Sequence, residues 1–186
     1  MEEAVYYLER LLTLALLAIA LGLDAFSLGL GVGLQGLRRR RILAVSLLIG
    51  LFHVVVPLIG MALGRWLSHS LGEFAVGLGG LLLLLMGIRM IIGSLFAEEG
   101  SSVRLASFWS VLLFAMTVSI DSLPVGITMG LSYVSTWAAL AMFGLFAFFL
   151  SGTGLVMGRH AGAWLGGYSE MVGGVILMLF GFKFLF

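Results

Sequence analysis

The sequence predicts an all-α polytopic membrane protein, with six transmembrane helices arranged as two inverted three-helix repeats. Of its 186 residues, 61% are hydrophobic and 10% are charged, whereas a soluble domain carries about 25% charged residues. About 20 apolar residues suffice to cross a bilayer as a helix. Short loops separate six such stretches, at about 11–34, 42–64, 73–96, 105–131, 135–157 and 164–186.

The first stretch carries a single charge, Asp24, at a depth near the middle of the bilayer. A charged side chain there costs about 2.5–3.5 kcal/mol or more, so it is expected to face the protein interior and to serve a function. The fourth stretch repeats the feature, because Asp121 lies as far from its C-terminal end as Asp24 lies from the end of the first.

The two halves of the chain repeat one another within one membrane domain, 1–186, with repeat 1 at about 8–96 and repeat 2 at about 105–186. An offset of 97 residues places Asp24 on Asp121 and matches the glycines that follow them. An offset of 94 places the glycines of the second and third stretches on those of the fifth and sixth. Because each repeat holds three spans, the second copy is expected to be inverted, an arrangement typical of secondary transporters.

Orientation follows from the arginine run between the first two spans, Arg38 to Arg41. Cytoplasmic loops carry the excess of Lys and Arg, so both termini are predicted to be extracytoplasmic. The chain has no cysteine, which excludes disulfides and thiolate metal sites. No cofactor is expected, and the net charge of +1 gives no sign of a nucleic-acid partner.

The helical period places small or oxygen-bearing side chains on one stripe with each aspartate. If the stripes face each other, Asp24 and Asp121 can neutralise a divalent cation, and carboxylate and hydroxyl oxygens suit ions such as Mg, Ca and Mn. The alternative is that each aspartate only bonds a neighbouring hydroxyl and locks helix packing. The supporting residues expected along the pathway are Ser27, Thr117, Ser122, Thr128, Pro57 and Pro124.

Two further residues are candidate metal ligands. His53 is either a nitrogen ligand or proton carrier, or a neutral histidine bonded within the bundle. Glu170 is either a third carboxylate at a cytoplasmic entrance or a side chain that reaches the interface. Pro57 and Pro124 lack an N–H and should free the carbonyls of His53 and Ile120 as possible cation ligands.

The chain resembles the MntP family of bacterial manganese efflux pumps, within the wider LysE-like group of transporters. The resemblance covers all six spans and rests on four motifs and their spacing. They are Leu23-Asp24-Ala25-Phe26-Ser27, Ser119-Ile120-Asp121-Ser122-Leu123, Pro57-Leu58-Ile59-Gly60, and Ser169-Glu170 before Gly173-Gly174. For this chain it implies six helices in two inverted repeats, a bacterial plasma (inner) membrane location, and Mn(II) export with Asp24 and Asp121 essential.

The sequence therefore predicts a secondary transporter, not an enzyme, that exports divalent metal ions by alternating access, with Mn(II) as first substrate. Its partners would be the metal ion and the lipid bilayer, with proton exchange as a hypothesis. Export of Fe(II), of another divalent ion or of an amino acid are alternatives. An intramembrane aspartyl protease also needs two buried aspartates, and a non-transporting scaffold is a further rival. The sequence leaves the oligomeric state open.

Overall fold

The computed structural model describes residues 2–33, 36–71, 74–95, 107–131, 136–161 and 164–185, and nearly all of them are helical. The helices are α1 (Glu2–Gly33), α2 (Arg39–Leu71), α3 (Phe74–Leu95), α4 (Phe108–Ser119), α5 (Ser122–Leu131), α6 (Thr136–Ala161) and α7 (Trp164–Leu185). The described part of the chain is thus all-α, as predicted.

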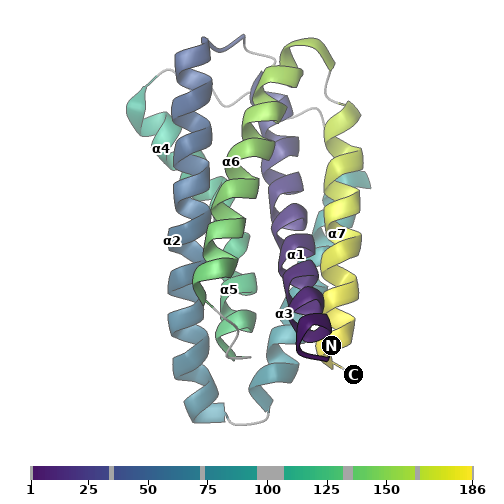
Figure 1. Ribbon diagram of the computed structural model, residues 1–186. Coiled ribbons are helices and arrows are strands. Elements are labelled where there is room, and N and C mark those ends of the chain that lie inside the picture. The colour runs from purple at the N-terminus through teal and green to yellow at the C-terminus, as the bar shows by residue number, and fades with distance from the viewer. Residues whose placement is uncertain are drawn as a thin grey trace.

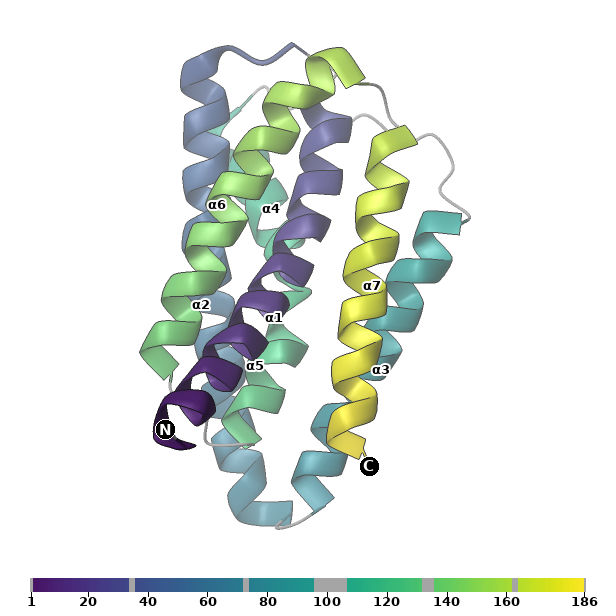
Figure 2. The ribbon, with the colours of Figure 1, turned by 45° about the vertical axis from the view of Figure 1, so that its right-hand side comes forward.

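Successive helices run in opposite directions along one bundle axis, with α4 and α5 together making a single passage (Figure 1). The start of α1 and the end of α7 lie at the same end of the bundle, and the loop before α2 lies at the other end. Seen from a second direction, α1 lies between α6 and α7, and α3 lies beside α7 (Figure 2).

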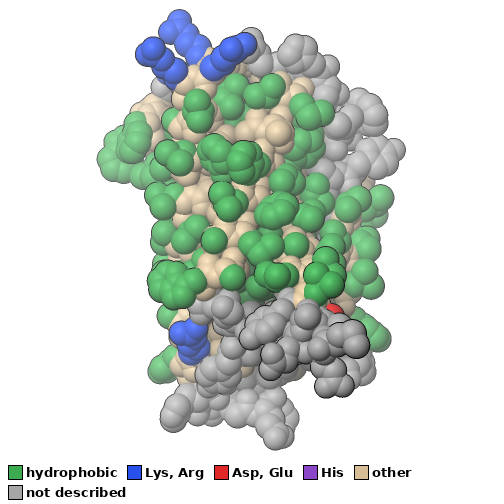
Figure 3. Space-filling model, viewed as in Figure 1, with side chains coloured by type: hydrophobic (Ala, Val, Ile, Leu, Met, Phe, Trp, Pro, Cys, Tyr) green, Lys and Arg blue, Asp and Glu red, His purple; other side chains and the backbone are tan. Residues whose placement is uncertain are grey.

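The outer surface is apolar along much of the bundle (Figure 3). Large hydrophobic side chains such as Leu47, Leu113 and Phe149 are more than half exposed. Among the described residues, three helical stretches are long and apolar enough to cross a membrane: Leu11–Gly33, Arg39–Leu67 and Trp137–Gly158. The pair α4–α5 is long and apolar enough for a fourth span if the two bent helices count as one, and α3 contributes the shorter apolar stretch Gly80–Arg89. The described helices thus give three or four candidate spans, and six spans stay a prediction.

The fourth predicted span is broken next to its aspartate. It consists of α4 and α5, which meet at 45° across Ile120 and Asp121. Pro124 contributes to this break because it has no N–H to donate to the carbonyl of Ile120. The prediction that this carbonyl is left free is wrong, since the N–H of Leu123 donates to it at 3.1 Å.

Glycines bring several pairs of helices into backbone contact, and two of these pairs correspond to each other. In both pairs, a Cβ added to the glycine would collide with a carbonyl oxygen of the facing helix. Between α1 and α6, the contacts are Gly29 with Ser151, Gly33 with Leu155, Gly154 with Phe26 and Gly158 with Leu30. Between α2 and α5, they are Gly60 with Leu123, Gly64 with Ile127, Gly126 with Pro57 and Gly130 with Met61. Small residues of this kind let membrane helices pack closely.

Candidate functional site

Three ionisable side chains from different parts of the chain approach one another inside the bundle. Asp24 projects from α1, His53 from α2, and Asp121 from the break between α4 and α5. The Nε2 atom of His53 lies 3.9 Å from Oδ1 of Asp121. The carboxyl groups of Asp24 and Asp121 are close enough to interact electrostatically. The structure thus brings together three of the four predicted metal ligands.

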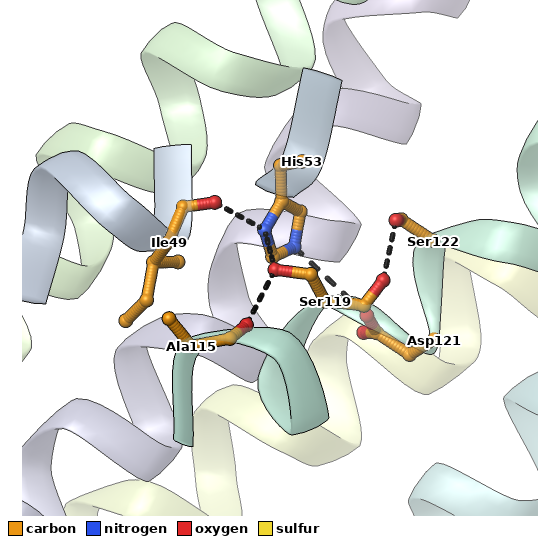
Figure 4. Close-up of polar contacts among 6 residues, drawn as sticks. All are labelled: Ile49, His53, Ala115, Ser119, Asp121 and Ser122. Atoms are coloured by element: carbon orange, nitrogen blue, oxygen red, sulfur yellow. Dashed lines mark hydrogen bonds and ion pairs between the residues drawn. The ribbon is translucent and has the colours of Figure 1, made fainter. Parts of the chain in front are cut away.

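The hydrogen bonds of His53 assign its proton (Figure 4). Its Nδ1 atom lies 3.0 Å from the carbonyl oxygen of Ile49, which can only accept, so Nδ1 carries a hydrogen. The hydroxyl of Ser119 lies 2.9 Å from the same Nδ1 and donates its own hydrogen to the carbonyl of Ala115. Ser119 is therefore a second acceptor for Nδ1–H. In the neutral ring, Nε2 is left with a lone pair that faces Asp121.

Three acceptor atoms of His53 and Asp121 have no hydrogen-bond donor beside them. Among the residues that the structure describes, the buried side-chain atoms without a hydrogen bond are His53 Nε2 and both carboxyl oxygens of Asp121. The His53 side chain is fully buried, and that of Asp121 is 11% exposed. Buried polar groups are nearly always hydrogen-bonded, so three acceptor atoms without a partner in one place make this position suited to a proton or a cation.

The helix break explains how the chain presents Asp121. The residue directly precedes Ser122, the first residue of α5, so its carboxyl group lies at the positive end of that helix dipole. The Ser122 hydroxyl does not turn toward the aspartate, because it donates to the carbonyl of Ser119 at 2.6 Å. Breaking the helix here therefore leaves the carboxylate available to a ligand.

The three groups do not yet form a coordination shell. Among the described His, Asp and Glu side chains, no set of three is arranged so that it could hold a metal ion. The 3.9 Å between Nε2 of His53 and Oδ1 of Asp121 is slightly less than twice a metal–ligand bond of about 2.1 Å, so these two atoms could share an ion only at a wide angle. A third ligand would have to come closer to complete the shell.

Arg89 of α3 is a charged residue that the sequence analysis did not single out as part of the site. Arg89 is exposed, and its guanidinium has only a minor electrostatic effect on the carboxyl groups of Asp24 and Asp121. A cation within a predicted span is a functional candidate by default, so the signal was present in the sequence. Ser119 was also missed as a partner of His53. The 66 residues that separate the two gave no spacing pattern to detect.

The predicted pathway residues with hydroxyl groups differ in their burial and in their hydrogen bonds. Thr117 does not face the site, since it is exposed and donates to the Leu113 carbonyl of its own helix. The buried hydroxyls of Ser122 and Thr128 bond backbone carbonyls near them, those of Ser119 and Pro124. Ser27 lies one turn beyond Asp24 and is half-buried.

The two prolines and Glu170 complete the predicted set. Pro57 is buried where the backbone of α2 meets Gly126 of α5, and α2 continues through it unbroken. Pro124 lies in the first turn of α5 and is half-buried. Glu170 lies on α7, but its side chain is outside what the structure describes, so its role stays a prediction.

Comparison with known proteins decides the family. The family described as "Putative manganese efflux pump" matches residues 36–185. The chain belongs to this family. A protein of Geobacillus thermodenitrificans named "Putative manganese efflux pump MntP" is 49% identical over 177 residues, covering 95% of this chain and 96% of the relative. Relatives with the same name from Geobacillus kaustophilus and Bacillus licheniformis are 45% and 44% identical, covering 97% and 95% of this chain and 98% and 94% of their own lengths.

No solved structure matches the chain. The manganese efflux pump family is one of transporters, so the chain is a transporter and not an enzyme. The intramembrane protease alternative is thereby excluded. The predicted family resemblance is confirmed over nearly the whole chain.

Proposed function

We propose that the chain exports divalent metal ions, with Mn(II) as its first substrate, and that Asp24, Asp121 and Nε2 of His53 bind the ion. The observation that carries the proposal is the group of orphaned acceptor atoms on His53 and Asp121. Lone pairs that face one another repel unless a cation or a proton lies between them. The names of the relatives support manganese as that cation.

The mixed ligand set narrows the class of metal. Mg(II) and Ca(II) prefer oxygen ligands alone, whereas imidazole nitrogen suits transition metals. Two carboxylates with one imidazole therefore favour a divalent transition ion over Mg(II) or Ca(II). Mn(II) binds most weakly in the first-row series, so selectivity for it would come from geometry and availability, and Fe(II) is the nearest competitor.

Alternating access follows from the need to assemble the shell. The ligands lie on α1, on α2 and at the α4–α5 break, and as placed they could not hold an ion. A shell that closes in one conformation and opens in another binds the ion on one side of the membrane and releases it on the other. A change of this kind lies within the rigid-body and hinge movements that proteins commonly use.

The glycine contacts support two inverted repeats. Each contact between α1 and α6 has a counterpart between α2 and α5 under the repeat offsets of 97 and 94 residues. Gly158 on Leu30, for example, corresponds to Gly64 on Ile127. In inverted-repeat transporters the substrate site lies at the interface of the repeats, where Asp24 and Asp121 approach each other here.

Proton exchange would complete the transport cycle. Metal ligands must be deprotonated to bind, so the arriving ion displaces protons and the departing ion lets them return. Two carboxyl groups that face each other inside the bundle also repel when both are charged, which favours a shared proton once the metal has left. The protein would then act as a metal/proton antiporter.

The proposed setting is the bacterial plasma membrane, with both termini outside. The start of α1 and the end of α7 lie at one end of the bundle, and Arg38 to Arg41 lie at the opposite end (Figure 1). Arginine-rich loops remain on the cytoplasmic side.

The test measures cell manganese in a bacterial strain that lacks its own exporter and is loaded with Mn(II). Wild type is compared with Asp24→Asn, Asp121→Asn and His53→Ala at equal amounts in the membrane. The matched control is Thr117→Val, which changes an exposed hydroxyl on α4 that bonds only its own helix. We expect wild type and the control to lower cell manganese, and both aspartate variants to fail.

The alternatives give different results. Export by both aspartate variants at the wild-type rate would mean that the carboxylates are structural, and the proposal would be wrong. Depletion of iron without manganese would keep the site and change the substrate. A Mn(II) flux into inverted membrane vesicles that is indifferent to an imposed pH gradient would remove proton exchange.

A further inference from the structure

A second feature lies away from the metal ligands, in a groove between α2 and α6. It has a volume of about 350 Å³ and opens on the outer surface, at the end of the bundle where α2 begins. Apolar side chains line it, among them Ile42 and Leu43 of α2 and Phe149 and Val156 of α6. This volume falls within the range of about 300–1,000 Å³ that is typical of ligand pockets.

The two hydroxyls in the groove have no hydrogen left to donate to a ligand. The Ser46 hydroxyl donates to the Ile42 carbonyl at 2.9 Å, and the Thr153 hydroxyl donates to the Leu150 carbonyl at 2.8 Å. Because the rest of the lining is mostly apolar, the groove favours an occupant that is apolar along most of its length.

Two arginines place positive charge at one end of this apolar groove. Arg39 and Arg40, both exposed, lie four and three residues before Leu43, so they are one helical turn above the groove wall. Figure 3 shows basic side chains gathered at this end of the molecule, next to hydrophobic surface. Arg39 also begins α2, and a helix N-terminus attracts anions. The rim thus complements a negative group.

We propose that the groove binds an anionic phospholipid, with one acyl chain lying between α2 and α6 and the phosphate held by Arg39 and Arg40. Basic sites next to membrane helices bind anionic headgroups in this manner. A zwitterionic lipid has the same phosphate but also a cationic group that the arginines disfavour, so it should bind more weakly than an anionic lipid. A second copy of the chain fits less well, since a two-fold interface around this groove would bring two arginine runs together on one side of the membrane.

The test titrates the full-length protein in detergent with dioleoyl phosphatidylglycerol or dioleoyl phosphatidylcholine and counts retained lipids by native mass spectrometry. One variant, Arg39→Gln/Arg40→Gln, removes charge from the rim. Another, Val156→Trp, fills the groove from α6, where Val156 is 51% exposed. The matched controls are Arg65→Gln, at the other end of α2, and Val175→Trp, on α7, where the side chain is 44% exposed.

We expect wild type to retain phosphatidylglycerol in preference to phosphatidylcholine. Each rim arginine should contribute about fivefold in affinity, so the double variant should bind about 25-fold more weakly. Val156→Trp should lose the tight lipid, and both controls should keep it. Equal retention of the two lipids, or equal loss in Arg65→Gln, would overturn the proposal.

Two further results would also overturn it. Displacement of the lipid by inorganic phosphate, unchanged in Val156→Trp, would show a phosphate site without an acyl-chain groove. A dimer mass that Val156→Trp converts to monomer would show that the groove is an interface between two copies.

Discussion

Replacing Ser119 with alanine should weaken Mn(II) binding, although Ser119 is not itself a proposed ligand. The effect would come from a less firmly held His53 imidazole. The Ser119 hydroxyl is one of two acceptors for the Nδ1–H of His53, and the carbonyl of Ile49 remains at 3.0 Å when it is removed. Outer partners of a metal-binding histidine are worth about 10–100-fold in affinity. Because one acceptor survives, we expect the lower end, about a tenfold loss. Losing one buried hydrogen bond should also lower stability by about 1 kcal/mol.

The assay is calorimetric titration of the purified protein with Mn(II), in a two-by-two set of Ser119→Ala and His53→Ala. If Ser119 acts by positioning the imidazole, its loss costs about tenfold in the wild-type background and almost nothing once His53 is gone. Ser151→Ala is the control, since this serine is equally buried on α6 and bonds only its own helix, at 3.3 Å. An equal loss from Ser119→Ala in both backgrounds would refute the reasoning.

Three further predictions concern the helix contacts, the charges and the protons. Gly126→Val places a side chain against the backbone of α2 and should lower the free energy of unfolding by about 1–3 kcal/mol. Gly31→Ala adds a methyl group in open space and should not destabilise the protein. Melting temperatures in detergent compare the two variants. Arg89→Gln removes an exposed positive charge that acts weakly on both carboxylates, so Mn(II) should bind slightly more tightly and leave slightly more slowly. Weaker binding in this variant would count against repulsion between Arg89 and the ion. Mn(II) affinity should fall as pH falls, by about tenfold per pH unit for each proton displaced, and a titration series from pH 8 to pH 6 that shows no slope would exclude proton release.

The paired aspartates were visible in the sequence because their signal is local. A lone charge within an apolar stretch stands out wherever the stretch later packs, and Asp24 and Asp121 stand at matched places in matched repeats. Family membership was likewise visible, since short motifs around these residues carry it. His53 was singled out for the same reason, but its neighbours could not be named.

The side chains expected beside the aspartates were only partly right. Thr117 lies four residues before Asp121 and should share its face on a continuous helix. The 45° break between α4 and α5 separates the two residues, so Thr117 points outward. The carbonyl of Ile120 was expected to be free, but at the same break it accepts a hydrogen bond from the N–H of Leu123. The sequence shows where Pro124 lies but not whether it breaks the helix. That outcome depends on what packs around the proline, since α2 continues unbroken through Pro57.

The sequence by itself determined the apolar helices, the two buried carboxylates and the glycine pattern, because hydrophobicity and helical period act within each segment. Only the tertiary structure decided which groups meet: His53 with Ser119 across 66 residues, and Nε2 with Asp121 at 3.9 Å. Such contacts depend on the rotation and depth at which two helices cross, and these are set by packing over their whole length. Glycines that let backbones touch fix that packing for α1 with α6 and for α2 with α5, and thereby fix where the carboxylates stand.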